Sequence, residues 1–296
     1  MSVTAFISYL THEKNYSPNT VKAYEKDIRG FASFCFEEYD IKHIEKAEYN
    51  IIRGWLVQMV NEGLSNRSVN RKIASLKAYY KFLLKTENIQ VNPLAKHKAL
   101  KTPTKIEVPF SEKEMESLLQ QVHFEDGFEG NRDRLIIELL YTTGIRRAEL
   151  INLRLTDIEL SQKKMKVLGK RSKERIIPLL DSTINLFEKY LDERMKLGSV
   201  KDSDHVFLSK SGIKIYETLV YRIINGYFSK VSSKVKKSPH ILRHTFATHL
   251  LNKGADLNSV KELLGHASLA STQVYTHNSI AELKKVHASA HPRSKK

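Results

Sequence analysis

The chain has 296 residues, the length of two ordinary domains, and 41% of them are hydrophobic, enough to bury a substantial core. Its formal net charge of +16 favours a polyanionic partner, usually nucleic acid, over a merely basic protein without such a partner. No apolar run approaches the ~18 residues that span a bilayer, the N-terminus lacks a secretory pattern, and the single Cys35 excludes an internal disulfide. We therefore expect a cytoplasmic protein with no membrane partner.

Two helices are predicted first. Ser17 followed by Pro18 marks the start of an amphipathic helix, since Ser caps helices and Pro suits their first position. Its apolar residues recur at spacings of three and four: Val21, Tyr24, Ile28, Phe31 and Cys35. A shorter helix is expected from Tyr49 to Val60, before the helix-breaking Gly63. Its predicted buried face is Ile52, Leu56 and Val60.

A third helix, from Ser65 to Lys85, has one apolar and one basic side. The apolar stripe consists of Val69, Ile73, Leu76, Tyr80 and Leu83. The basic residues predicted to contact phosphates are Arg67, Arg71, Lys72, Lys77 and Lys81. No acidic residue lies between Ser65 and Lys85, whereas a solvated helix face usually mixes both signs because like charges repel. Phosphate binding is therefore favoured over plain solvation.

A domain boundary is predicted in the proline-containing segment 92–109, which shows no helical period. The alternative is a long loop inside one domain, which is less common at this length. Residues 1–91 are then an all-helical DNA-binding domain, and residues 110–296 form a second domain. Residues 1–105 hold 17 Lys+Arg against 10 Asp+Glu and the remainder 32 against 23, so both parts are basic. A clamp around DNA fits this distribution better than a basic tail on a neutral enzyme.

The second domain is predicted to be mixed, with helices around a small antiparallel sheet. Ser111 and Glu114 have the spacing of a capping box, and a helix over Asn131–Tyr141 ends at Thr142-Thr143-Gly144. Two apolar arms, Met165–Leu168 and Arg175–Leu179, flank a polar connection with Lys170 at its tip, which predicts a β-hairpin. Helices return from Asp181, and a helix over Asp256–Leu264 stops at Gly265. The fold class is therefore mainly α.

The stretch 240–275 concentrates groups that can act on a phosphate, and two residues from earlier in the chain complement it. The candidate catalytic residues are Arg146, Lys170, His240, Arg243, His266 and Tyr275. Two arginines match phosphate oxygens, a tyrosine can attack as a nucleophile, and a lysine or histidine can transfer protons. No carboxylate cluster for Mg²⁺ accompanies them, so we expect metal-free phosphoryl transfer through a phosphotyrosine, without a cofactor.

Each of these residues also has a structural alternative, since a lone histidine or tyrosine is more often a packing or surface residue. His240 and His244 have the spacing of a metal pair, but Ile241 stands where a zinc protease has glutamate. Spacing alone therefore does not secure the site.

Several motifs together resemble the tyrosine recombinase (integrase) family, most closely the bacterial Xer recombinases. The matching blocks are TTGIRRAEL (142–150), VLGKRSKERIIPL (167–179), HILRHTFATHLL (240–251), LLGHASLASTQVYTH (263–277) and HPR (291–293). YSPNTVKAYEKDI and SNRSVNRKIASLKAYYKFL look like the family's core-binding domain. Arg171 departs from the glycine that is frequent at the hairpin tip, and Ala148 from a frequent serine.

The resemblance implies a role for each matched position. Arg146 and Arg243 would hold the scissile phosphate, which Tyr275 attacks to give a 3′-phosphotyrosyl link. Lys170 would protonate the leaving 5′-oxygen, His240 would accept the proton of Tyr275, and His266 would orient the phosphate. Glu149 and His244 would support these groups. Four protomers would exchange strands of double-stranded DNA through a Holliday junction, within a C-shaped clamp on each site.

The resemblance also implies partners. Each chain would assemble into a tetramer with itself or a paralogous recombinase, and a DNA translocase is a possible activator. The tail's apolar residues Ile280, Leu283 and Val286 would dock into a neighbouring protomer, although packing on their own domain is the alternative. The leading function is resolution of chromosome or plasmid multimers. The alternatives are a mobile-element integrase or transposase and a catalytically silent DNA-bridging protein, while a type IB topoisomerase shares the chemistry but fits this compact form less well.

Overall fold

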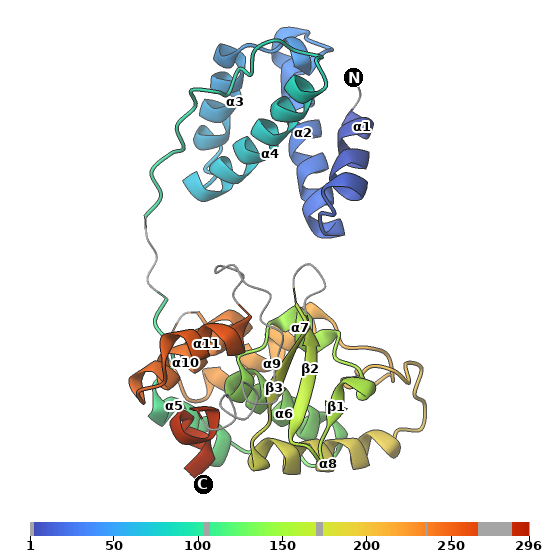
Figure 1. The fold of residues 1–296 in the computed structure, drawn as a ribbon, viewed down its shortest axis with the longest axis vertical. Coiled ribbons are helices and arrows are strands. Elements are labelled where there is room, and N and C mark those ends of the chain that lie inside the picture. The colour runs from blue at the N-terminus through green and yellow to red at the C-terminus, as the bar shows by residue number, and fades with distance from the viewer. Residues whose placement is uncertain (1–2, 104–106, 170–173, 235, 266–285, 296) are drawn as a thin grey trace. The chain divides into compact units, whose positions relative to one another are not determined.

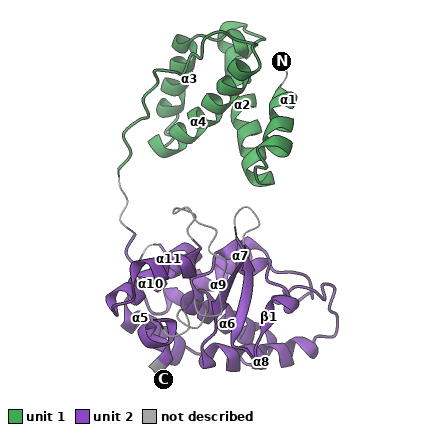
Figure 2. Ribbon diagram, in the orientation of Figure 1, with its two compact units in different colours: residues 1–105 green, residues 106–296 purple. Residues whose placement is uncertain are grey.

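The computed structural model divides the chain into two compact units, residues 1–105 and 106–296 (Figure 2). The structure describes residues 3–103, 107–169, 174–234, 236–265 and 286–295. It is mainly α-helical, as predicted, with one small antiparallel sheet in the second unit (Figure 1). None of the described helices combines the length and apolar character that a membrane span requires.

The first unit is all-helical over its described residues. After α1 (Val3–Ser8) and a short π-helix (Tyr9–Glu13) come α2 (Pro18–Tyr39), a 3-10 turn (Ile44–Lys46), α3 (Tyr49–Asn61) and α4 (Asn66–Lys85). Both predicted caps form: the Ser17 hydroxyl accepts the amide of Thr20, and the Ser65 hydroxyl accepts the amide of Ser68. These bonds satisfy amides that the first turn of a helix leaves without a partner.

The core of the first unit lies between α2, α3 and α4. The predicted stripe of α4 is buried at all five positions, and in the α2 stripe four of five are buried, with Tyr24 half-buried. The predicted face of α3 is wrong in part, because Val60 is 42% exposed and Leu56 half-buried. Ile52, Trp55 and Met59 form the buried stripe instead. The large Trp55 ring packs against Phe31 and rotates the buried face by one position.

The predicted linker, residues 92–109, does not run free along its whole length. Leu94 is fully buried in the core of the first unit. The Asn70 side chain on α4 donates to the carbonyl of Leu100 (2.8 Å) and accepts its amide (2.9 Å). Its beginning therefore packs on the first unit, while Phe110 is buried in the core of the second.

The second unit surrounds a central helix. The helices are α5 (Glu112–Gln120), α6 (Phe128–Thr143), α7 (Arg147–Ile151), α8 (Asp181–Met195), α9 (Glu217–Ser229), α10 (Pro239–Asn252) and α11 (Leu257–Leu264). Short 3-10 turns cover Leu155–Asp157 and Pro292–Lys295. Every residue from Leu135 to Thr143 on α6 is buried, and this helix packs against α8, α9 and α10. The predicted capping box of Ser111 and Glu114 is present at the start of α5.

The sheet contains β1 (Ile158–Glu159), β2 (Lys164–Leu168) and β3 (Glu174–Pro178), in that order and antiparallel. The hairpin of β2 and β3 was predicted, and its register pairs Leu168 with Glu174. Figure 1 shows α7 near the tip end of this hairpin and α8 at the opposite end. The carboxyl end of β2 and the start of β3 therefore lie at the end of the unit where α7 is found.

Candidate active site

The turn between α6 and α7 places Arg146. Gly144 ends α6 in the left-handed conformation (φ +60°), and a Cβ there would lie 2.4 Å from the Phe246 ring, so only glycine fits. Arg146 then caps α7, because its amide donates to Oε2 of Glu149 at 2.8 Å. Its guanidinium Nη1 donates to Oε1 of the same carboxylate at 2.8 Å, and its side chain is 31% exposed. The arginine is thus fixed at one end and reachable by a ligand.

Glu149 lies between two arginines. Its carboxylate is buried and accepts both Nη atoms of Arg175 (3.0 and 2.7 Å) in addition to Nη1 of Arg146. Burial alone raises the pKa of such a carboxyl, but the hydrogen bonds and charge of Arg175, followed by the bonds from Arg146, hold the pKa of Glu149 below its ordinary value. Glu149 is therefore ionised and ties α7 to β3.

Arg243 reaches the same region from α10. Its Nη1 donates to the carbonyl of Gly144 (2.5 Å) and its Nη2 to the carbonyl of Leu264 (2.6 Å). Burial and the positive charge of Arg146 lower the pKa of Arg243 to about 10, so it stays charged near neutral pH. The predicted pair of arginines therefore comes together, as two cations beside a single carboxylate.

His240 and His244 lie on the exposed side of α10. His240 Nε2 is 3.5 Å from Oε2 of Glu107, in the segment that leads into α5. Partial burial and the charges of Lys236 and Arg243 lower the pKa of His240 below 6.5. Its imidazole is therefore neutral near pH 7 and able to accept a proton.

Three of the predicted residues, Lys170, His266 and Tyr275, lie outside the described residues. So do Ile280 and Leu283 of the predicted docking stripe. The described part of the tail, residues 286–295, packs on its own unit, with His287 and His291 buried beside the end of α6. Docking into a neighbouring protomer stays a prediction.

Arg175 belongs to the candidate site, although the sequence predicts only an apolar hairpin arm at this position. Its side chain is 5% exposed and donates to Glu149. On β3 its side chain alternates inward together with that of Ile177. A charged residue at an inward position of a short strand is the signal that identifies it, since buried charges need partners.

The basic side of α4 is less uniform than its sequence. Asp27 on α2 is 1% exposed and accepts both Nη atoms of Arg71 (2.5 and 2.9 Å), while Nζ of Lys72 lies 3.5 Å away. No described carboxylate forms an ion pair with Arg67, Lys77 or Lys81, which are all exposed. Of the five predicted phosphate contacts, two thus share their charge with a buried acid.

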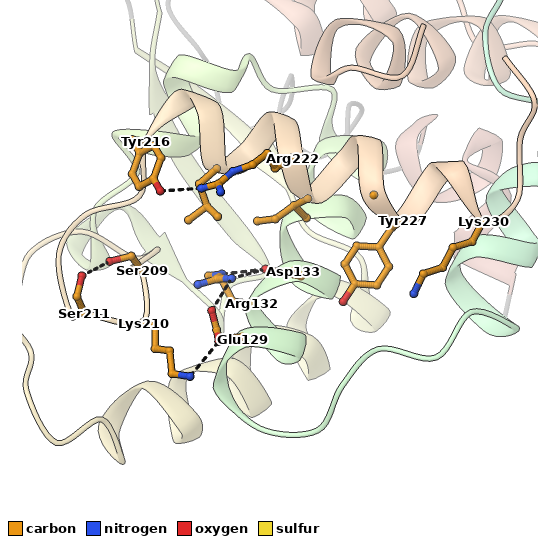
Figure 3. Close-up of a pocket in the computed structure, with 13 residues that line it drawn as sticks. Glu129, Arg132, Asp133, Ser209, Lys210, Ser211, Tyr216, Arg222, Tyr227 and Lys230 are labelled. Atoms are coloured by element: carbon orange, nitrogen blue, oxygen red, sulfur yellow. Dashed lines mark hydrogen bonds and ion pairs between the residues drawn. The ribbon is translucent and has the colours of Figure 1, made fainter. Parts of the chain in front are cut away.

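A cavity of about 630 Å³ lies beneath α9, beside the start of α6 and the loop before α9 (Figure 3). Both arginines that line it have partners within the protein: Arg132 donates to Asp133 (2.9 Å) and Arg222 to the Tyr216 hydroxyl (2.8 Å). The residues that line it include none of the described candidate catalytic residues. The candidate site is therefore the cluster of arginines, reached through the partly exposed Arg146, rather than this cavity.

Comparison with known proteins gives matches to both units. The phage integrase family matches residues 109–282, and its N-terminal SAM-like domain matches residues 3–87. A protein named tyrosine recombinase XerC from Staphylococcus epidermidis is 40% identical over 291 residues, covering 98% of this chain and 97% of that protein. Another of that name from Chlorobaculum parvum is 37% identical, covering 97% and 93%.

A solved structure shows the same fold. It is that of the XerH site-specific recombinase bound to a palindromic difH substrate in a post-cleavage complex. Its TM-score is 0.72 at 23% identity, and the match covers 93% of this chain and 81% of that one. The arrangement of helices and sheet is thus shared with a protein whose structure was solved on DNA.

Proposed function

The chain belongs to the phage integrase family of tyrosine recombinases, and from this premise we propose that it is a site-specific DNA recombinase of Xer type. It cleaves and rejoins double-stranded DNA through a 3′-phosphotyrosyl intermediate and a Holliday junction. The relatives named XerC, matched over nearly their full length, favour this assignment over a mobile-element integrase. They also favour it over a catalytically silent bridging protein.

The observation that carries the proposal is the pairing of Arg146 and Arg243 around the turn at Gly144. Together with Arg175 they place three guanidinium cations beside one carboxylate, so the local charge is positive by two. Arginine forks match phosphate oxygens, and fixed cations stabilise the charge that builds up on a phosphorane-like transition state. Arg146 remains partly exposed and has donors left for the scissile phosphate.

The remaining catalytic roles follow from chemistry. Tyr275 attacks the phosphorus, displacing the 5′-oxygen, while His240, neutral near pH 7, accepts the tyrosine proton. Lys170, carried by the hairpin of β2 and β3, protonates the departing oxygen. His266 hydrogen-bonds the phosphate. The hydroxyl of a partner strand then reverses the attack, so the bond energy is conserved and no nucleotide cofactor is needed.

The proposal extends to domains and partners. Residues 1–91 form the core-binding domain, 92–109 the connection, and 110–296 the catalytic domain. Two DNA sites are held by four protomers, either identical or from a paralogous recombinase, and a DNA translocase is a candidate activator. The supporting observation is that both units are basic.

A nicked suicide substrate tests this function. Wild-type protein is expected to form a covalent adduct on denaturing gels, and Tyr275→Phe is expected to form none while binding DNA with unchanged affinity. Tyr221→Phe, which removes the hydroxyl of an exposed tyrosine on α9, is the matched control and should retain the adduct. An adduct formed by the Tyr275 variant would refute the assignment of the nucleophile.

A further inference from the structure

The carboxyl end of α11 is bound by three arginines from three different elements. Nε of Arg175 on β3 donates to the carbonyl of Leu263 (3.0 Å), and Nη2 of Arg243 on α10 to that of Leu264 (2.6 Å). Nη2 of Arg146, at the start of α7, donates to that of Gly265 (3.1 Å). The last carbonyls of a helix lack partners within it and form its negative end, so cations are favoured there.

Arg175 differs from Arg146 in having no face left for DNA. Its side chain is 5% exposed, and its Nε and both Nη atoms are engaged by Leu263 and Glu149. Arg146, by contrast, is 31% exposed and shares only part of its fork with Glu149. Arg175 therefore cannot contact the phosphate and acts only through its neighbours.

Those neighbours are the parts that must converge on the phosphate. Through Glu149, Arg175 fixes the carboxylate that orients Arg146. Through Leu263, it fixes the end of α11, whose next carbonyls hold Arg243 and Arg146 and which His266 follows in sequence. Arg175 also lies on the strand that follows the connection carrying Lys170.

We propose that Arg175 is a positioning residue for the recombination reaction: its fork joins β3, α7 and α11 and thereby sets Arg146 and Arg243 for the scissile phosphate. This inference rests on the function proposed above. Lysine cannot replace the fork, because one ammonium cannot serve a bidentate carboxylate and a carbonyl in three fixed directions.

Glycine at position 265 fits the same account. Gly265 ends α11 at φ +63°, and a Cβ there would lie 3.0 Å from Nη1 and 3.1 Å from Cδ of Arg175. The guanidinium and the backbone of α11 are thus in direct contact. A methyl group at this position would press on Arg175 without changing any donor or acceptor.

The first test is Arg175→Lys in the full chain, measured on a nicked suicide substrate at saturating DNA. We expect the cleavage rate to fall about 10- to 100-fold, as for a misplacement near 1 Å, while the Kd for DNA changes by less than about threefold. Arg194→Lys is the matched control: Arg194 is also buried and donates to the carbonyls of Asp202, Ser203 and His205, away from the candidate site. It should cleave within about twofold of wild type.

The second test approaches Arg175 from α11. Gly265→Ala should slow cleavage clearly more than Gly254→Ala, which also places an alanine at positive φ (+84°) but with nothing within 4 Å of the new Cβ. If Arg175→Lys fails to fold, these two glycine variants test the positioning role of Arg175 in its place. Equal cleavage by the two alanine variants would then overturn the proposal.

Failure of the positioning role and failure of the recombinase chemistry would give different results. Folded Arg175→Lys cleaving at the wild-type rate, or losing rate only as it loses DNA affinity, overturns the positioning role. So does an equal loss in Arg194→Lys. A wild-type protein that forms no adduct, or a Tyr275→Phe protein that does, would instead refute the proposed recombinase chemistry and leave the geometry of Arg175 untouched.

Discussion

At the scale of single residues, each unit contains a buried carboxylate that pairs with cations from other elements. Asp27 joins α2 to α4 through Arg71 and Ser75, and Glu149 joins α7 to β3. Removing one partner from such a buried group leaves the other uncompensated, which costs more than the pair contributes. These carboxylates therefore fix the relative placement of helices more than they add net stability.

Asp27→Asn is expected to destabilise the protein by roughly 2 to 4 kcal/mol, because Arg71 and Lys72 lose the charge that faces them while Ser75 keeps a weaker acceptor. Urea unfolding followed by circular dichroism measures this. Glu25→Gln is the control, since the Glu25–Arg29 pair is exposed and should contribute less than about 1 kcal/mol. Equal stability of both variants would contradict a structural role for Asp27.

The sequence located Arg146 and Arg243 through their motifs but did not reveal what holds them. Asp27 and Arg175 were missed for one physical reason: their partners are distant in sequence, at separations of 44 and 26 positions. Helical and strand periods report which face an element buries, not which charge on another element it meets. The pairing of Arg71 with Asp27 was missed for the same reason.

At the scale of elements, the carboxyl end of α6 is completed by the tail. His287 Nε2 donates to the carbonyl of Thr142 (2.6 Å), and His291 Nε2 donates to that of Tyr141 (3.2 Å). Both imidazoles are almost fully buried, and Arg293 Nε beyond them donates to Glu138 (3.1 Å). Because α6 leads through Gly144 into Arg146, the tail supports the turn that presents this arginine.

Acid is expected to release this tail. Burial lowers the pKa of His287 to about 4, and burial together with the charge of His287 lowers that of His291 as well. Below about pH 6.5 these histidines bind protons in the unfolded state but stay neutral in the folded state. Their contribution to the free energy of unfolding is therefore complete above pH 6.5 and is lost as the pH falls toward 4. Hydrogen exchange of the tail amides, corrected for intrinsic rates, should show protection at pH 7 that declines by pH 5.

His287→Gln keeps a neutral donor for Thr142 and should remove part of this pH dependence, leaving the share of His291. His123→Gln, at an exposed position, is the control and should leave it unchanged. Tail protection that is equal at pH 5 and pH 7 in the wild-type protein would contradict the account.

Elements were predicted best where local chemistry alone determines them. The caps of α2, α4 and α5 and the glycine stop of α11 all formed at the expected residues. The hairpin was correct to within a residue, but β1 was not predicted, since two residues carry too little pattern. The buried face of α3 lies one position away from the predicted one, because the large Trp55 side chain is buried in place of the smaller Leu56 and Val60.

At the scale of the whole molecule, both units are basic, which fits the DNA partner proposed for the chain. On α4 the exposed Arg67, Lys77 and Lys81 lie within about 80° of one another around the helix, on the arc given by 100° per residue. In the second unit Arg146, Arg175 and Arg243 meet at the carboxyl end of α11. Under the proposed function, we expect charge on the first unit to serve affinity along the DNA backbone and charge on the second to serve chemistry.

DNA binding should therefore depend steeply on salt, and the first unit should carry part of that dependence. Each phosphate contact releases counterions, so Arg67→Ala, Lys77→Ala or Lys81→Ala should each reduce the slope of log K against log salt by about one, with similar weakening on specific and non-specific duplexes. Lys189→Ala, which removes an exposed charge from α8 at the other end of the sheet from α7, is the matched control (Figure 1). Fluorescence anisotropy between low and moderate salt measures the slopes. A slope unchanged by the α4 variants, or lowered as much by Lys189→Ala, would mean that α4 does not face the DNA and that its basic side is only solvated.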